Sequence, residues 1–517
     1  MHNIYQDIDL LINYSIKKKF ITDSDIYFAR NLLVDYFKLT DFIEINDDKT
    51  LLEPIQTILN RLVDYAYEHQ IITENDITSR DLADTKIISL LLPMPGQIIK
   101  EFNSIKESSG IKAAADFFYS FSIDSNYIRM DRIHKNLIWQ TATEFGGLDI
   151  TVNLSKPEKD PRAIAAAKLI PSSGYPECLL CPENTGFAGN LNHPARQNLR
   201  LLPLKLNSEK WWFQYSPYVY YNEHCIVLKD NHEPMKLTVD TFIRLIDFVD
   251  LFPHYFIGSN ADLPIVGGSI LNHDHFQGGN HEFPMAKASG EKTFIHDDYN
   301  GLTAEIVKWP MSVVRLKSAD REKVIAASDI IFRKWKNHSD PENGILSHTL
   351  EGEENTPHNT VTPIARMRDG QYEMDLVLRN NLTSEEHPFG IFHPHEELHH
   401  IKKENIGLIE VMGLAVLPGR LAEELHEIKN ILLNKKDYTS DSLDKESPVF
   451  KHKDWIEYLI KKHQGTLSAE NAAQLIKDEI GLKFETVLTH CGVFKRNSQG
   501  SRGFTEFLAS AGFKELI

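Results

Sequence analysis

A short alternating run between two pairs of glycines constrains the fold of this chain more than any other feature. The run His273–Gln277 reads His-Asp-His-Phe-Gln, and Gly267–Gly268 and Gly278–Gly279 stand on either side of it. On an extended strand, alternate side chains share one face and lie roughly 6.5–7 Å apart. The run therefore predicts a strand with two imidazoles and an amide on one face. The glycines allow the backbone to come close to a ligand without a Cβ in the way.

The residue types on that face suit phosphoryl chemistry. A neutral imidazole such as that of His275 is a good nucleophile at neutral pH, and a covalent intermediate divides one transfer into two easier steps. The amide of Gln277 can donate to a phosphoryl oxygen as charge develops on it. Taken alone, however, two histidines at this spacing fit a metal site or a surface pair better than a catalyst.

Composition excludes several classes of function. The 517 residues carry a formal charge of −17, which argues against nucleic acid as the main partner. Acidic residues already occur at Asp7 and Asp9, and no apolar run approaches the roughly 20 residues that span a bilayer. We therefore expect a cytoplasmic chain that does not bind membranes. Four cysteines make no disulfide framework, and the close pair Cys178 and Cys181 suggests metal or redox use.

Hydrophobic patterning divides the chain into four regions. Residues 1–135 have helical periodicity, with a capping box expected at Thr22–Asp25, and contain no evident cluster of polar site residues. We expect this region to be a scaffold or a dimerisation element. Mixed segments with strand patterns follow at 136–310 and 311–420, and helical patterning returns at 421–517. The predicted strands are Trp211–Tyr215, Cys225–Leu228, Pro264–Ile270, Thr360–Met367 and Glu373–Arg379.

The stretch Asp262–Gly279 resembles the signature of the type 2 family of galactose-1-phosphate uridylyltransferases. These are distant members of the histidine-triad superfamily in which the last triad histidine is replaced by glutamine. Only Asn272 departs from the family pattern. The resemblance implies an α+β fold with duplicated histidine-triad-like antiparallel sheet halves and helical extensions at both ends. It also implies that His275 is the nucleophile, that Gln277 contacts the transferred phosphoryl group, and that the protein is a homodimer.

The run Cys178–Asn184 resembles the zinc-binding turn of the type 1 enzymes. By that resemblance Cys178 and Cys181 bind zinc together with a downstream histidine and His273, as a closed structural site. His232 is the expected third ligand, with His193 and His224 as alternatives. In the competing interpretation the two cysteines are small buried hydrophobic residues, as we expect Cys225 and Cys491 to be.

Substrate contacts are predicted on several segments. The loop at 186–196 has the glycines, amides and guanidinium of a nucleotide clamp, with Asn192 and Arg196 as the expected contacts, although a polar surface loop explains it equally well. Gly268 and Ser269 are expected near phosphate. The segment at 402–410 resembles the hexose-binding segment of the type 1 enzymes, which implies that Lys403 or Glu410 binds sugar hydroxyls.

A second metal site is also conceivable. The type 1 enzymes hold a further structural metal with a His-x-His pair, which His393 and His395 match, and Glu282 and Glu291 are the alternatives for an acidic partner. Ordinary surface histidines are the simpler explanation for this pair.

The resemblance implies a transferase that acts in two steps. UDP-glucose leaves its uridylyl group on His275, and galactose 1-phosphate then takes it to form UDP-galactose. Two alternatives remain. One is a hydrolase or phosphorylase that uses the same histidine, and Gln277 disfavours the hydrolase because an amide cannot shuttle a proton to activate water. The other is a nucleotide-sugar sensor without turnover, for which His275 would be dispensable.

Overall fold

A computed structural model describes residues 3–44, 53–155, 174–268, 270–352, 354–434, 438–463 and 466–516. The chain divides into two compact units, which we describe separately. The first unit consists of Met1–Lys135, Ser155–Pro234 and Asn272–His275. The second unit consists of Asn136–Leu154, Met235–Leu271 and Phe276–Ile517.

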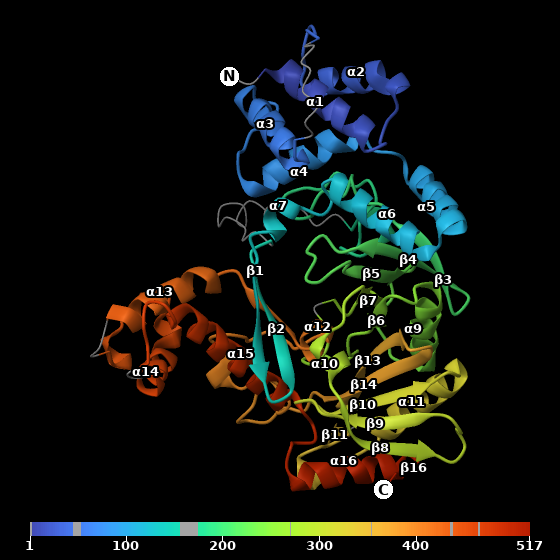
Figure 1. Cartoon of the computed structure of the whole chain (residues 1–517), viewed down its shortest axis with the longest axis vertical. Coiled ribbons are helices and arrows are strands. Elements are labelled where there is room, and N and C mark those ends of the chain that lie inside the picture. Colours follow the sequence, from blue (N-terminus) through green and yellow to red (C-terminus); the bar gives the residue numbers. More distant parts are fainter. Residues whose placement is uncertain are drawn as a thin grey trace. The chain divides into compact units, whose positions relative to one another are not determined.

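Helices dominate the Met1–Lys135 part of the first unit (Figure 1). They are α1 (Ile4–Lys17), α2 (Ile26–Tyr36), α3 (Ile55–Glu68), α4 (Ile77–Ser89), α5 (Pro95–Ser109), α6 (Ile111–Asp124) and α7 (Met130–Ile133). Side-chain caps fix several of their starts. Asn3 accepts from the backbone of Tyr5 before α1, and Asp76 accepts from Thr78 and Ser79 before α4. The capping box predicted at Thr22–Asp25 is confirmed, since the two residues bond reciprocally just before α2.

Three antiparallel strands complete the first unit. They are β3 (Leu202–Leu206), β4 (Glu209–Tyr215) and β5 (Cys225–Lys229), paired in the order β3-β4-β5. The predicted strands at Trp211–Tyr215 and Cys225–Leu228 are therefore confirmed. Tyr215 lies fully buried, and its hydroxyl donates to the carbonyl of Ala115 in α6, so the strands pack against the helices of the same unit.

The second unit contains a long antiparallel sheet. Its strand order is β7-β6-β13-β14-β10-β9-β8-β16. The bounds are β6 (Phe256–Gly258), β7 (His275–Gly279), β8 (Gly290–His296), β9 (Thr303–Val307), β10 (Val313–Ser318), β13 (Asn359–Arg368), β14 (Gln371–Asn380) and β16 (Phe513–Glu515). The strands predicted at Thr360–Met367 and Glu373–Arg379 are confirmed as β13 and β14. Helices α9 (Val239–Leu251) and α11 (Arg321–Lys336) pack on this sheet (Figure 1).

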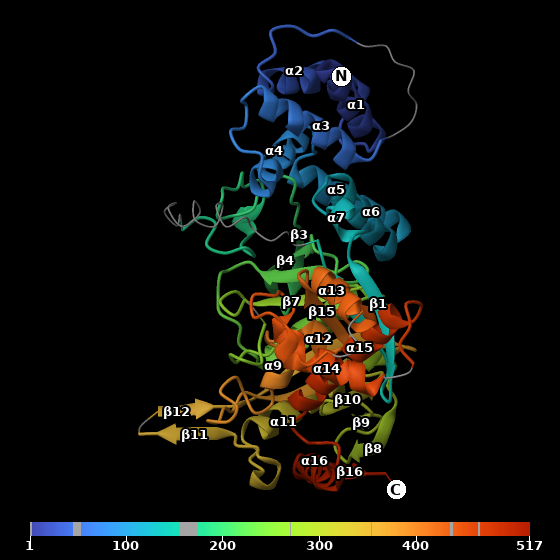
Figure 2. The ribbon, with the colours of Figure 1, turned by 90° about the vertical axis from the view of Figure 1, so that its left-hand side faces the viewer.

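Smaller elements surround this sheet. A three-stranded sheet joins β1 (Leu137–Thr143), β2 (Gly146–Asn153) and β15 (Leu414–Pro418), and a separate hairpin pairs β11 (His348–Glu351) with β12 (Glu354–Pro357), which extends away from the rest of this unit in Figure 2. The short helices α10 (Pro284–Lys287) and α12 (Leu408–Val411) precede the C-terminal helices. These are α13 (Leu421–Asn434), α14 (Lys453–Lys462), α15 (Ala472–Cys491) and α16 (Ser498–Ser510).

The α+β class is confirmed, with antiparallel sheets and helical regions toward both ends of the chain. The strand predicted at Pro264–Ile270 is wrong. Pro264, Ile265 and Val266 form a turn, and Gly267 lies so close to the carbonyls of Ala261 and Leu263 that a Cβ there would come within 2.6 and 2.7 Å of them. Among the residues described, none of the helices combines the length and apolar character that crossing a bilayer requires.

Candidate active site

Four predicted metal ligands meet in the first unit. The Sγ of Cys178 lies 3.3 Å from Nδ1 of His273, and the Sγ of Cys181 lies 3.2 Å from Nδ1 of His232. The two sulfurs are 3.4 Å apart, and all four ligand atoms lie within 4.8 Å of one another. In a tetrahedral zinc site with bonds of about 2.0–2.3 Å, ligand atoms lie about 3.4–3.8 Å apart. The cluster therefore has the donors and the spacing of a site compatible with zinc.

Neighbouring groups hold these side chains in place. The amide of Asn184 donates to the carbonyls of Cys178 and Cys181, at 2.8 Å each, and so fixes the turn that carries both thiols. Nε2 of His273 bonds to the carbonyl of Lys229 at 2.8 Å. Because a carbonyl only accepts, the ring proton is on Nε2, and the lone pair of Nδ1 faces the sulfurs.

Burial suits the cluster to a cation. His273 is fully buried and Cys181 is 4% exposed. Burial and the neighbouring Cys178 raise the pKa of the Cys181 thiol to about 12, and burial lowers the pKa of His273. The cluster thus contains lone pairs that converge but no fixed positive charge, and a bound cation would allow Cys181 to ionise at neutral pH.

The structure decides between the alternative third ligands. His232 joins the cluster, whereas the ring of His193 lies against Phe187, with 5.1 Å between ring centroids, and that of His224 against Tyr221, at 4.5 Å. Cys225 and Cys491 are buried core residues outside the cluster, as predicted.

His275 follows the cluster by two residues and begins β7. It is 4% exposed, and its Nδ1 donates to the carbonyl of His273 at 2.8 Å. This bond leaves the lone pair on Nε2. Burial lowers the pKa of His275 to about 4, so the ring is neutral at pH 7. An oriented, neutral imidazole of this kind can act as a nucleophile.

Gln277 is two residues further along β7 and belongs to the second unit. It pairs with Gly258 of β6, which in turn pairs with Ile364 of β13, so all three lie on one face of the sheet. The space at Gly258 is narrow, because a Cβ there would come within 2.7 Å of the Leu408 side chain. Oε1 of Gln277 is buried and has no hydrogen-bond partner among the residues described.

The structure adds Asn260, which the sequence did not indicate. Its Oδ1 accepts from the backbone N–H of Leu408 at 2.9 Å. A Cβ at Gly268 would lie 2.7 Å from Nδ2 of Asn260, and one at Gly407 would lie 3.0 Å from its Oδ1. The two glycines therefore leave room for this amide. A single asparagine outside any motif gives no signal in a sequence.

The segment predicted to bind hexose contains a buried ion pair. Nζ of Lys402 donates to Oε1 of Glu410 at 3.0 Å, and Oε2 of Glu410 accepts from the N–H of Gly407 at 3.2 Å. Lys403, the lysine named from the sequence, lies apart from Glu410, with its ammonium 5.0 Å above the ring of Phe389. Lys402 is 5% exposed, so it is the lysine that sets the charge beside Glu410.

The remaining predicted contacts lie on a glycine-rich loop of the first unit. Asn192 donates its backbone N–H to Oδ1 of Asn190, and the guanidinium of Arg196 lies 5.7 Å from the ring centroid of Tyr127. Gly189 has a positive φ of 78° and packs against the backbone of Ala195, so the loop is compact. Ser269 lies outside the described residues.

The second metal pair is rearranged in the structure. His395 approaches Glu397 and His490, whereas Nδ1 of His393 bonds to the carbonyl of Pro394. Neither acidic partner considered from the sequence is involved, because Glu282 pairs with Arg368 and Glu291 pairs with Arg496. The rings of His395 and His490 are stacked, with centroids 4.1 Å apart and planes inclined by 30°. Stacked rings cannot direct two in-plane lone pairs to one nearby point, so this group is poorly arranged for a metal.

Comparisons with known proteins identify the family of this chain. The family model described as "Galactose-1-phosphate uridyl transferase, N-terminal domain" matches residues 31–234, and its C-terminal counterpart matches residues 248–456. The chain is 55% identical over 510 residues to the galactose-1-phosphate uridylyltransferase of Caldanaerobacter subterraneus subsp. tengcongensis, and 98% of each chain is covered. It is 48% identical over 516 residues to that of Bacillus subtilis, with 99% of each covered. A crystal structure of yeast Ap4A phosphorylase aligns with a TM-score of 0.31 at 11% identity, covering 64% of this chain and 89% of that one.

Proposed function

Because this chain belongs to the galactose-1-phosphate uridylyltransferase family, we propose that it transfers a uridylyl group from UDP-glucose to galactose 1-phosphate. The products are glucose 1-phosphate and UDP-galactose, the exchange that brings galactose into central metabolism in the Leloir pathway. The observation that carries the mechanism is the arrangement of His275, which is buried, neutral and held through Nδ1 by the carbonyl of His273.

In the first half-reaction Nε2 of His275 attacks the α-phosphorus of UDP-glucose. A P–N bond forms, the bond between that phosphorus and the bridging oxygen breaks, and glucose 1-phosphate leaves with the electron pair. The hydrogen bond from Nδ1 to the His273 carbonyl supports the positive charge that develops on the ring.

In the second half-reaction a phosphate oxygen of galactose 1-phosphate attacks the same phosphorus. The P–N bond breaks, its electron pair returns to Nε2, and UDP-galactose is released. Because one phosphorus is attacked twice from the same site, the kinetics are expected to be ping-pong.

Other residues orient the phosphates and sugars in this proposal. Gln277 donates from its amide nitrogen to a phosphoryl oxygen of the transferred group. Asn260 and the backbone at Gly268 line the phosphate path, Asn192 and Arg196 contact the uridine half, and Glu410, held by Lys402, accepts from hexose hydroxyls. Ser269 and Lys403 stay predicted contacts.

Cys178, Cys181, His232 and His273 would hold a zinc ion, whose role when bound is structural rigidity. The residues themselves do the rest. His273 anchors the backbone that presents His275, because its Nε2 is bonded to Lys229 and its carbonyl receives the Nδ1 proton of His275.

Incubation with UDP-glucose alone tests the function. A transferase releases one glucose 1-phosphate per site and stops, with UMP retained on the protein. Continuous release of UMP would instead identify a hydrolase. Exchange activity that survives in His275→Ala would rule out this nucleophile, and a wild-type protein without any exchange would favour a nucleotide-sugar sensor.

We further propose that the enzyme acts in the cytoplasm as a homodimer. Four cysteines without a disulfide support a reducing compartment. Size-exclusion chromatography with light scattering tests the dimer, and a monomeric mass would contradict it.

A further inference from the structure

The helical region of the first unit contains a polar cavity that the sequence did not predict. The cavity has a volume of about 140 Å³ and lies among α3, α4 and the segment around α7. Its walls include three arginines and three aspartates, among them Asp81, Asp84, Arg129 and Arg132. The sequence had indicated no cluster of polar residues in this region. The side chains come from three separate segments, so no local motif reveals them.

Two ion pairs form one side of the cavity. Both terminal nitrogens of the Arg129 guanidinium donate to the carboxylate of Asp84, and Nη2 lies 2.8 Å from Oδ1. Arg132 likewise makes a bidentate ion pair with Asp81, in which Nη1 lies 2.9 Å from Oδ2. Nη1 of Arg129 also lies 3.5 Å from Oδ1 of Asp81, so the two pairs touch.

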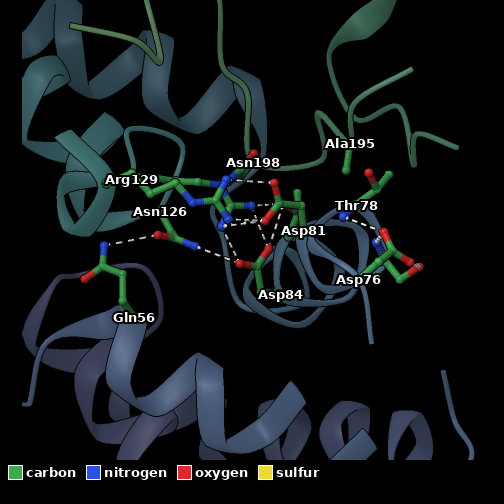
Figure 3. A network of polar contacts seen from close by, with 12 residues as sticks. Gln56, Asp76, Thr78, Asp81, Asp84, Asn126, Arg129, Ala195 and Asn198 are labelled. Carbon is green, nitrogen blue, oxygen red and sulfur yellow. Dashed lines mark hydrogen bonds and ion pairs between the residues drawn. The ribbon is translucent and has the colours of Figure 1, made fainter. Parts of the chain in front are cut away.

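Two amides extend this network into the protein. Asn126 is 1% exposed, donates to Asp84 at 3.4 Å, and accepts from Nε2 of Gln56 at 3.1 Å. Figure 3 shows Gln56, Asn126, Arg129, Asp81 and Asp84 directed toward one another. The inner wall is thus built from planar groups that present donors and acceptors side by side.

Stability alone explains this arrangement poorly. Ion pairs removed from water often add little stability, because the loss of hydration offsets the attraction between the charges. The neighbouring contact between α1 and α3 has one ion pair, from Arg61 to Asp7, set among fully buried apolar residues such as Leu11 and Leu62. A polar wall around a cavity is what a polar ligand requires, since each hydroxyl of a ligand needs a partner there.

The balance of charge selects the class of ligand. Three arginines and three aspartates line the cavity, so no cation is left uncompensated for a phosphate group, which favours arginines that carry no carboxylate partner. No aromatic side chain is among the described residues that line it, which disfavours a nucleobase. What remains is a neutral molecule with many hydroxyl groups.

Size agrees with that class. A buried water needs roughly 10–15 Å³ of cavity volume, so a cavity of 140 Å³ has room for about ten water molecules. This number is close to the roughly twelve non-hydrogen atoms of a hexose, each of which takes about the place of one water. We propose that the cavity lined by Asp81, Asp84, Asn126, Arg129 and Arg132 binds an unphosphorylated hexose. These side chains are not among those proposed for uridylyl transfer, and the proposal does not depend on that function.

Binding of a free hexose to the full-length enzyme tests the proposal. Isothermal titration with galactose and with glucose, without any nucleotide sugar, is expected to show saturable binding of one hexose per chain. In Asp81→Asn/Arg132→Gln the affinity should fall by about tenfold or more, because hydrogen bonds to charged groups are lost. The rate of uridylyl exchange should stay within about twofold of wild type, since the pair contacts no transfer residue.

Two further variants keep the test decisive. Ile77→Trp fills the mouth of the cavity from a residue that is 48% exposed, and it should abolish hexose binding even if the double variant folds poorly. Arg502→Gln/Glu342→Gln removes an exposed ion pair elsewhere and should leave hexose binding unchanged. No saturable binding of either hexose, or binding that persists in both cavity variants, would overturn the proposal. Tighter binding of inorganic phosphate than of hexose at this cavity would overturn the assigned class.

Discussion

The Cys/His cluster of the first unit and the arginine–carboxylate network of the second unit are both buried and polar, but they are built differently. In the network, Nε of Arg315 donates to Asp375 at 2.7 Å, and Arg366 donates to both Asp375 and Glu373, at 2.8 and 2.6 Å. Every charge there faces an opposite charge. In the cluster, the ligand atoms of Cys178, Cys181, His232 and His273 lie within 4.8 Å of one another, and all four are electron-pair donors.

The difference separates a binding site from a structural core. The network is complete in the protein alone, and it helps to fix α10, because Arg315 also donates to the carbonyls of Met285 and Ala288. The cluster instead has the donor set of a metal site compatible with zinc. Removing a side chain of the Cys/His cluster should therefore change the zinc content of the protein. Removing a side chain of the arginine–carboxylate network should change only its stability.

The largest effect is expected from Cys181→Ala. The protein should lose its bound zinc, and the free energy of unfolding should fall by about 5 kcal/mol or more, because metal binding and folding are coupled. Exchange activity should fall with it, since the backbone that carries His273 and His275 loses the rigidity that a bound metal would supply. Elemental analysis and urea unfolding measure both effects. Cys225→Ala, in a buried cysteine outside the cluster, is the matched control and should keep its metal. An unchanged zinc content in Cys181→Ala would refute the ligand assignment.

A smaller effect is expected from Asp375→Asn. This change leaves Arg315 and Arg366 without their shared carboxylate and should cost about 3–5 kcal/mol of stability, as removal of one partner from a buried pair does. Zinc content should stay as in the wild type. The exposed pair between Lys112 and Asp116 is the control, where Asp116→Asn should cost less than about 0.5 kcal/mol. If Asp375→Asn also cost less than about 0.5 kcal/mol, the arginine–carboxylate network would contribute little to the stability of the protein.

Acid unfolding probes the same carboxylate without a substitution, because protonation removes its charge. Burial alone would raise the pKa of Asp375, but Arg315 and Arg366 outweigh it and hold the pKa at about 2. Because this pKa lies below the unfolded value, the stability is present above about pH 4 and is lost as the pH falls through 2, by about 2 kcal/mol. Urea unfolding between pH 2 and 5 should show this slope in the wild type. An equal slope in Asp375→Asn would assign it to other groups.

The smallest effect is expected at the second histidine group. His490→Ala should leave the zinc content unchanged and lower the free energy of unfolding by about 1 kcal/mol, since its Nδ1 only accepts a weak bond of 3.3 Å from the N–H of His395. Loss of one metal equivalent in this variant would show that the stacked rings rearrange to bind a metal.

These regions also show what a sequence can predict. The alternation of His275 and Gln277 predicted neighbouring positions on one face of a strand, and β7 contains both, whereas His273 lies in a bend before the strand begins, so the predicted strand was too long by two residues. The spacing of Cys178 and Cys181 predicted a turn with two adjacent thiols. Both features are local, so no knowledge of the tertiary fold was needed.

Features that depend on distant segments were not predictable in the same way. His232 could not be separated from His193 and His224 until the strands placed it beside Cys181. The pairing of Lys402, not Lys403, with Glu410 depends on the direction of each side chain in an irregular segment. The apolar run at Pro264–Ile270 resembles a strand, yet close backbone packing at Gly267 makes it a turn. The division into four regions and the roles of individual site residues stay predictions.

The most direct test of the mechanism is to locate the uridylyl group on the protein. Purified enzyme is mixed with UDP-glucose alone, quenched at alkaline pH and digested, and the peptide spanning His273–Gln277 is analysed by mass spectrometry. The mechanism predicts one added UMP on His275, its disappearance when galactose 1-phosphate is added before quenching, and no adduct in His275→Asn. A UMP adduct on His273, or on any residue outside this strand, would contradict the division of roles between the two histidines.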